Sequence, residues 1–209
     1  PHCTRITPEL LPLVALTQPE IETVVASVDG GAANVQDIYP LAPLQEGLLF
    51  HHLADPLADP YLHSSVLGFP AREQLDAFLD ALDQVIARHD ILRTGVVWQG
   101  LNAPLQVVWR RAVVPRHLQR FDGADPAAQL QAWLHAPDAA LCLQQAPLIH
   151  AHLAHDLEAG RWLLGLQHHH LVMDHTTLEL LIEEVRAHLA GRQQLLPPPL
   201  PFRDFVAHT

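Results

Sequence analysis

The feature that most constrains the fold is a pair of apolar segments in the second half of the chain. Residues 148–156 read LIHAHLAHD and residues 161–169 read RWLLGLQHH, with the short stretch LEAG at 157–160 between them. Two strand-like runs around a short glycine-containing connection predict a β-hairpin. A hairpin is marginally stable alone. The chain must therefore supply further strands and covering helices.

Other segments complete this pattern. We expect helices at 17–28, 43–53, 71–89, 126–135 and 176–190, a strand at 61–69, and a second hairpin from 92–99 and 104–110. The first and last helices open with capping boxes, in which Thr17 precedes Glu20 and Thr176 precedes Glu179 by three positions. Gly191 is expected to end the last helix. The mixed order of elements predicts an α+β fold (α/β in the broad sense), with one mixed sheet and helices packed on it.

Composition narrows the class of protein. A chain of 209 residues lies at the upper edge of one domain, so two small units are also possible. The net charge of −11 and the lack of a basic run argue against binding to nucleic acid or to anionic membranes. No apolar stretch is long enough to span a bilayer. Two cysteines suggest neither a disulfide scaffold nor a metal pair, so we expect a cytoplasmic protein.

The segment QHHHLVMDH at 167–175 carries the densest chemistry of the chain. Three interpretations are open: a solvated strand end, a metal site built from His169, His170, Asp174 and His175, or acid/base chemistry by one histidine. Residues 169 and 170 would point to opposite faces of a strand, which disfavours the metal site. A single imidazole can handle a proton near neutral pH.

Four segments resemble the condensation domains of nonribosomal peptide synthetases. Residues 169–174, HHLVMD, fit the HHxxxD part of that family's HHxxxDG signature. RHDILRT at 88–94 resembles its RHExLRT segment, PLAPLQEGLLF at 40–50 its first core motif, and FRDF at 202–205 its YxDYA-type segment. The segments occur in the family's order, and the resemblance spans roughly residues 37–209.

A fifth segment resembles a motif of dual epimerisation/condensation domains. HHLADPLAD at 51–59 is similar to the HH[I/L]xxxxGD signature, with Ala58 where that signature has glycine. The resemblance implies an epimerisation motif made of His51, His52 and Asp59. The alternative is a solvated helix end that runs into a turn.

The resemblance implies a chloramphenicol acetyltransferase-like fold of two lobes with a tunnel between them. Residues 1–36 would be a linker or N-terminal extension that follows an upstream carrier domain, and 37–196 the N-terminal lobe. Residues 197–209 would begin the connection to a C-terminal lobe, which this chain lacks. We therefore expect activity from the intact domain and none from this fragment alone.

The family also implies roles for single residues. His170 would be the catalytic histidine that handles the amine proton during peptide-bond formation, and His169, Asp174 as structural support and His175 would belong to the same catalytic site. Asp174 would form a buried structural ion pair with Arg93. His175 stands where the signature has glycine, which raises a question about how a substrate arm passes this point.

Partners follow from the same resemblance. Donor and acceptor would arrive as thioesters on the 4′-phosphopantetheine of an upstream and a downstream peptidyl carrier domain, with no metal or cofactor bound directly to this chain. We further expect contacts with the C-terminal lobe and an adjacent adenylation domain, a monomer, a bacterial source and a role in the biosynthesis of a secondary metabolite such as an antibiotic. A related coenzyme A- or carrier-dependent acyltransferase, a non-epimerising condensation domain and a non-catalytic carrier-docking module are the alternatives.

Overall fold

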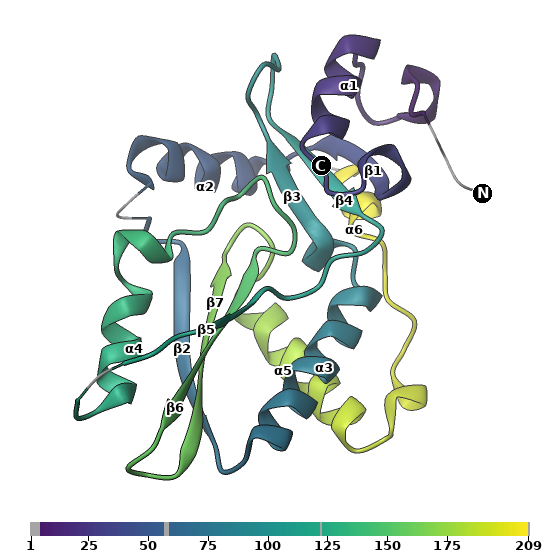
Figure 1. The fold of residues 1–209 in the computed structure, drawn as a ribbon. Coiled ribbons are helices and arrows are strands. Elements are labelled where there is room, and N and C mark those ends of the chain that lie inside the picture. The colour runs from purple at the N-terminus through teal and green to yellow at the C-terminus, as the bar shows by residue number, and fades with distance from the viewer. Residues whose placement is uncertain (1–4, 57–58, 122, 209) are drawn as a thin grey trace.

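The computed structural model describes residues 5–56, 59–121 and 123–208, and its strands form two sheets where a single sheet was expected (Figure 1). The three-stranded sheet has the antiparallel order β1 (Val35–Pro40), β4 (Leu105–Trp109), β3 (Thr94–Val97). The four-stranded sheet has the order β2 (Leu62–Phe69), β7 (Arg161–His169), β6 (Ile149–Asp156), β5 (Arg116–Leu118). The predicted β6–β7 and β3–β4 hairpins are confirmed, and β5 adds to β6 in parallel.

Helices cover both faces of the four-stranded sheet. The helices are α1 (Gln18–Ala26), α2 (Pro43–Ala54), α3 (Arg72–Arg88), α4 (Pro126–Leu134), α5 (His175–Leu189) and the short α6 (Phe202–Val206). Helices α3 and α5 pack together on one face of the sheet, and α4 packs on the other (Figure 1). None of the helices in the described part of the chain is long and apolar enough to cross a membrane.

Strand alternation explains how one sheet serves two cores. In β6, Ile149 and Ala151 face the core formed with α3 and α5, whereas Ala154 packs with Leu130 and Leu134 of α4. Successive side chains of a strand point to opposite faces, so a strand covered on both sides is apolar at nearly every position. This is why the segment that forms β7 contains the apolar run WLLGL, whereas in β6 histidines alternate with apolar residues.

The N-terminal segment packs on the three-stranded sheet. Ile6, Leu11 and Ile21 are buried in the same cluster as Ile38 of β1. Strand β1 lies in a stretch for which neither a helix nor a strand was expected, because its pairing with β4 is long-range and leaves little local signal. The described part of the predicted linker is thus folded onto the sheet, and the boundary proposed at residue 36 stays a prediction.

The two predicted capping boxes have different outcomes. At α1, Thr17 accepts from the backbone N–H of Glu20, and the Glu20 side chain accepts from the N–H of Thr17, as predicted. At α5 the prediction of a box beginning at Thr176 is wrong. The cap there is Asp174, whose Oδ1 accepts from the backbone N–H of Thr177 at 2.7 Å.

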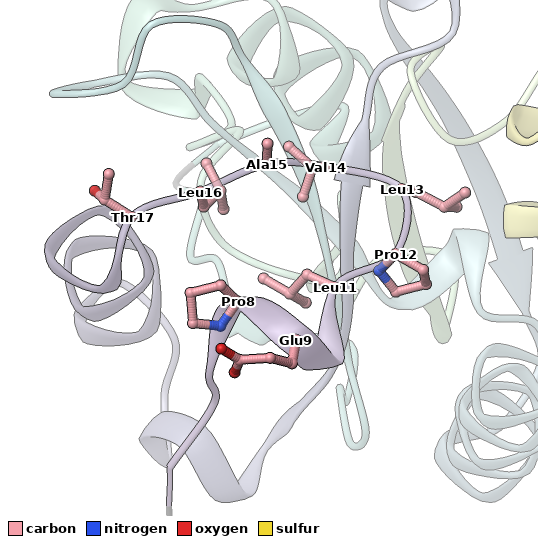
Figure 2. A pocket seen from close by; sticks show the side chains of 9 residues that line it. All are labelled: Pro8, Glu9, Leu11, Pro12, Leu13, Val14, Ala15, Leu16 and Thr17. Carbon is pink, nitrogen blue, oxygen red and sulfur yellow. The ribbon is translucent and has the colours of Figure 1, made fainter.

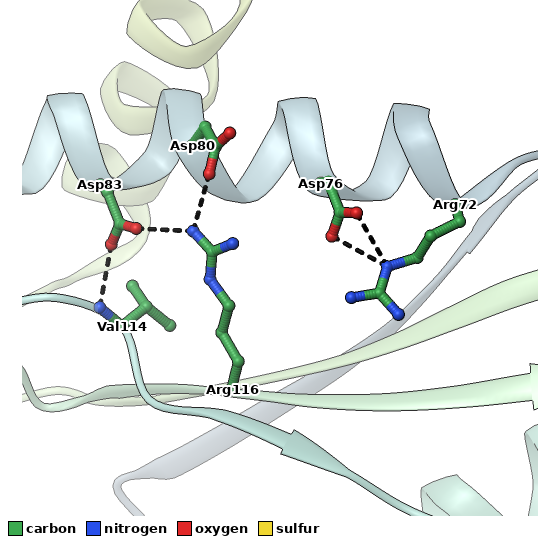
Figure 3. Close-up of polar contacts among 6 residues, drawn as sticks. All are labelled: Arg72, Asp76, Asp80, Asp83, Val114 and Arg116. Atoms are coloured by element: carbon green, nitrogen blue, oxygen red, sulfur yellow. Dashed lines mark hydrogen bonds and ion pairs between the residues drawn. The ribbon is translucent and has the colours of Figure 1, made fainter.

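Polar contacts hold the edge of the four-stranded sheet to α3 (Figure 3). Arg116 of β5 donates to Asp80 at 2.9 Å and to Asp83 at 2.7 Å, and Asp83 also accepts from the backbone N–H of Val114. A short parallel edge strand thereby gains a second attachment besides its pairing with β6.

Candidate active site

The histidine run lies at the end of β7, where His168 and His169 are buried and His170 is half-buried. His168 shares a face with the residues that pack on α3, whereas His169 points to the opposite face and reaches Asp59. His170 follows the last residue of the strand, and its backbone N–H donates to the Tyr61 carbonyl at 3.0 Å. The strand thus separates the histidines, and we expect them to differ in chemistry.

The contacts of His170 define its tautomer. Its Nδ1 lies 3.0 Å from the carbonyl oxygen of Met173, which can only accept a hydrogen bond. Nδ1 therefore carries the ring proton in the neutral form, and Nε2 is left with a lone pair. The ring is half-buried, so it is held in place yet reachable. This is the state required of a general base.

A cavity of about 370 Å³ opens beside His170. Its walls come from the first turns of α2, the loop at 170–174, and α6. The lining side chains include Pro43, Leu48, Ile91, His170, Phe202 and Phe205. All four segments that carry the family resemblance therefore meet around one cavity, although they are far apart in the sequence.

Gln45 connects two walls of this cavity, and the sequence did not single it out. It is 6% exposed, and its Nε2 donates to the Leu171 carbonyl at 2.8 Å and to Gln106 at 3.0 Å. Its Oε1 accepts from the backbone N–H of Ala42. The signal was a glutamine inside an apolar helix pattern, which becomes informative only once its burial is known.

The predicted ion pair between Arg93 and Asp174 is not formed. The Nη1 of Arg93 donates to Gln36 at 2.9 Å and also to the carbonyl of Trp109. Asp174 instead caps α5, and the N–H of Thr177 holds the pKa of its carboxyl below the usual value. The Asp174 carboxylate is hydrogen-bonded at the N-terminus of α5, whereas the acceptors of Arg93 lie on β1 and β4 of the three-stranded sheet.

His175 lies apart from the cavity. Its side chain is 84% exposed, and its Nε2 lies 3.2 Å from Glu179 Oε1. The ring therefore points to solvent and does not narrow the cavity beside His170. With His169 directed at Asp59, the four side chains of the alternative metal site do not converge on one point.

The second histidine pair lies at the end of α2. Asp59 Oδ2 lies 2.7 Å from His52 Nδ1 and 2.9 Å from His169 Nε2, and its Oδ1 accepts from the N–H of Tyr61. Burial opposes ionisation of Asp59, but the Tyr61 N–H and the two imidazoles lower the pKa of this carboxyl below its usual value. Ala58, where the signature has glycine, lies outside the described residues.

One further histidine lies against His170, and another lies against Tyr61. The ring of exposed His51 lies 5.7 Å from that of Tyr61, which in turn lies 6.3 Å from that of His170. His63 of β2 lies 4.3 Å from His170 and was missed in the sequence. Burial and, next, the neighbouring His170 lower the pKa of His63. Its position became informative only through the register of β2, which pairs it with His168.

A larger hollow, about 740 Å³, lies in the N-terminal segment (Figure 2). Its lining runs from Pro8 to Thr17, is mostly apolar, and includes none of the motif residues. Glu9 and Thr17 are its polar side chains. The candidate active site is therefore the cavity at His170, which the motif residues line.

Comparison with known proteins agrees with these motifs. The sequence model of the condensation domain family matches residues 35–209. The chain is 48% identical over 207 residues to malpinin synthetase from Mortierella alpina, covering 98% of this chain and 3% of that protein. It is 30% identical to a linear gramicidin synthase from Brevibacillus parabrevis, covering 99% of this chain and 4% of that protein. The relatives thus include a fungal protein, and a bacterial source stays a prediction.

The fold is also found in a solved condensation domain. The starter condensation domain of rhizomide synthetase RzmA superposes with a TM-score of 0.59 at 21% identity, covering 77% of this chain and 41% of that one. This confirms the predicted α+β class and chloramphenicol acetyltransferase-like fold. The chain spans a small part of its curated relatives and less than half of this structural neighbour. From its family match, its relatives and its fold, the chain belongs to the condensation domain family of nonribosomal peptide synthetases.

Proposed function

We propose that this chain is the N-terminal lobe of a domain that joins a donor and an acceptor, each carried as a thioester, through a peptide bond. One observation carries the proposal. His170, with a free Nε2, stands beside a cavity whose walls are built from all four family segments. A non-catalytic docking module would not require an imidazole held in this tautomer.

Peptide-bond formation requires only a weak base. The α-amine of an aminoacyl acceptor has a pKa of about 7.7–8.0, so part of it is already nucleophilic near neutral pH. The amine nitrogen attacks the donor thioester carbonyl, its proton passes to His170 Nε2, and the carbon–sulfur bond breaks. The proton then neutralises the leaving thiolate. The donor carrier is left with a free thiol, and the lengthened peptide remains on the acceptor carrier.

The partners belong to the same proposal. Both substrates would be bound through 4′-phosphopantetheine, on an upstream donor carrier domain and a downstream acceptor carrier domain. The C-terminal lobe would close the cavity from the other side, and an adenylation domain would load the acceptor. The 209-residue chain alone would then be inactive, because it supplies one wall of the tunnel.

We further propose that the intact domain epimerises the last residue of the donor from L to D. The support is the segment at 51–59, whose Asp59 is hydrogen-bonded both to His52 and to His169 of the HHxxxD motif. A Cα proton beside a thioester is a much weaker acid than an ammonium, so this step needs a positioned base and a second group that returns a proton. A non-epimerising condensation domain is the competing candidate.

The first prediction tests His170 in the intact domain with its two carrier domains. His170→Gln should lower the rate of peptide-bond formation by about 10²- to 10⁴-fold, the range typical of a lost general base. His155→Gln is a matched control, because His155 is exposed and stacks on Trp162. The measurement is the rate at which product appears on the acceptor carrier.

Three results would contradict parts of this proposal. A His170→Gln domain as fast as the His155→Gln control would remove the catalytic role. Peptide-bond formation by the 209-residue chain alone would show that the second lobe is dispensable. If an L-configured donor gives an L-configured product with the intact wild-type domain, the epimerising activity is excluded while condensation stands.

A further inference from the structure

Asp59 is the point at which the two histidine pairs meet. Its carboxylate is 4% exposed and binds one ring from each pair, His52 and His169, through the same oxygen. The other oxygen accepts from the backbone N–H of Tyr61 at 2.9 Å, and the Tyr61 carbonyl accepts from the backbone N–H of His170. One buried side chain therefore holds segments that are more than a hundred positions apart in the sequence.

The tautomer of His169 follows from its contacts. The backbone N–H of Leu171 donates to His169 Nδ1 at 3.1 Å, so Nδ1 must be the unprotonated nitrogen. The proton is then on Nε2, which donates to Asp59. Both ring nitrogens are occupied and the side chain is 1% exposed, so His169 cannot serve as the base.

The same argument disfavours a metal at this place. His52, Asp59 and His169 offer ligand atoms within 4.8 Å of one another, which makes them a candidate metal group within the described residues. A metal would need the lone pair of His169 Nε2, but that nitrogen carries the proton. The group is therefore a hydrogen-bonded junction centred on an ionised carboxylate.

His52 is held by the same carboxylate, whereas His51 is not. The lowered pKa of Asp59 keeps this carboxyl an acceptor, so His52 Nδ1 must donate to it. His51 precedes it on the helix, about 100° away around the helix axis. Its ring lies 5.7 Å from that of Tyr61, which lies 6.3 Å from that of His170. Each pair thus has one ring bound to Asp59 and one ring, His51 or His170, outside this junction.

We propose that Asp59 is a positioning residue that joins the two histidine pairs, and that it leaves His51 and His170 as the proton-handling rings. This inference rests on the proposed function. In epimerisation one neutral ring takes the Cα proton, and the electron pair moves into the thioester carbonyl as an enolate. The other ring, in its protonated form, returns a proton to the opposite face of Cα. Proton exchange with solvent restores both rings.

The second prediction uses the intact domain with its carrier domains, in the variants Asp59→Asn and Asp59→Glu. Asparagine has the same shape, but its amide N–H₂ would face either the Tyr61 N–H or the two imidazole N–H groups. We expect Asp59→Asn to slow peptide-bond formation and Cα hydrogen exchange by about 10²-fold, because both motifs lose their alignment. Asp59→Glu should recover part of both rates, since it keeps the charge.

Two readouts separate positioning from stability alone. Ring-nitrogen NMR of the wild-type domain should show the His169 proton on Nε2, and Asp59→Asn should change that signal and the signal of His52. His51→Gln should slow Cα exchange more than it slows condensation of a D-configured donor. His52→Gln should slow both reactions, because Asp59 then loses a donor. His155→Gln again serves as the control.

The proposal is overturned if Asp59→Asn keeps both rates within about twofold of wild type. It is also overturned if the wild-type His169 proton is found on Nδ1, a test that needs no variant. If the wild type forms peptide bonds but never exchanges the Cα hydrogen, the epimerising function fails. The NMR signals and the peptide-bond rate of Asp59→Asn still test the positioning role in that case.

Discussion

At the scale of single residues, the physical role of Asp174 differs from the role that its place in the motif predicts. The residue belongs to the HHxxxD pattern, yet its carboxylate caps the N-terminus of α5 and is exposed to solvent. Arg93 is 6% exposed, and burial lowers its pKa while Asp90 and Tyr39 oppose that shift. The two side chains stabilise different parts of the fold, so their contributions should be independent.

The third prediction is a double-mutant cycle on these two residues in the intact domain. Asp174→Ala should cost about 0.5–2 kcal/mol of unfolding free energy, the usual cost of a lost cap, and Asp174→Asn should recover most of it. Arg93→Met should be independently destabilising. The coupling between Arg93→Met and Asp174→Ala should stay within about 0.5 kcal/mol. A coupling of several kcal/mol, measured by chemical denaturation, would instead restore the predicted ion pair.

At the scale of elements, the contact of β7 with α4 depends on a residue without a side chain. A Cβ at Gly165 would lie 2.8 Å from Leu134 Cδ1 and 3.1 Å from its Cδ2. Strand β7, which ends at His169, therefore packs closely against α4 at Gly165. The neighbouring Gln167, which is fully buried, donates to the Leu134 carbonyl at 3.0 Å and fixes the same contact.

The fourth prediction compares two glycine substitutions. Gly165→Ala should destabilise the domain by about 1–3 kcal/mol, because α4 must shift to admit the methyl group. Gly47→Ala is the matched control: Gly47 lies within α2, and a Cβ there would meet nothing within 4 Å. It should stabilise by roughly 0.5–1 kcal/mol through helix propensity. Equal effects of the two substitutions on the unfolding free energy would contradict the close packing.

At the scale of the whole molecule, the buried histidines make the fold sensitive to acid. Burial lowers the pKa of His150, His152 and His168 to about 4, from an ordinary value of 6.5. Neighbouring histidine rings add to the shift at all three residues, and a hydrogen bond to Gln167 opposes it at His152. Below pH 6.5 the unfolded chain binds protons that the folded chain cannot accept. The contribution of these neutral rings to the unfolding free energy is therefore fully present above pH 6.5, and it is lost as the pH drops toward 4.

The fifth prediction follows from that linkage. The unfolding free energy should fall between pH 6.5 and pH 4 by up to about 1.4 kcal/mol per pH unit for each of these histidines. His168→Gln should make the dependence shallower, whereas His155→Gln, at an exposed position, should not. The measurement is chemical denaturation at several pH values, and a flat profile over this window would contradict the buried neutral state.

Local patterns predicted much of the architecture. The helix at 71–89 and the hairpin at 148–169 were correctly placed, because periodicity and turn residues act over a few positions. Strand β1 and the cap at Asp174 were not, since the first depends on a distant partner and the second on where a loop ends. Asp59 was found by its motif, but its two imidazole partners could not be deduced from spacing.

The sequence by itself determined the family, the helices and hairpins, and the choice of His170 as the residue to examine. These rest on local order and on short patterns of residue types, which a chain carries whether folded or not. Only the tertiary structure decided that the strands form two sheets, that Arg93 and Asp174 do not pair, and that Asp59 joins His52 to His169. A carboxylate binds whichever donors the packing of distant elements brings to it, and that packing is a property of the whole fold.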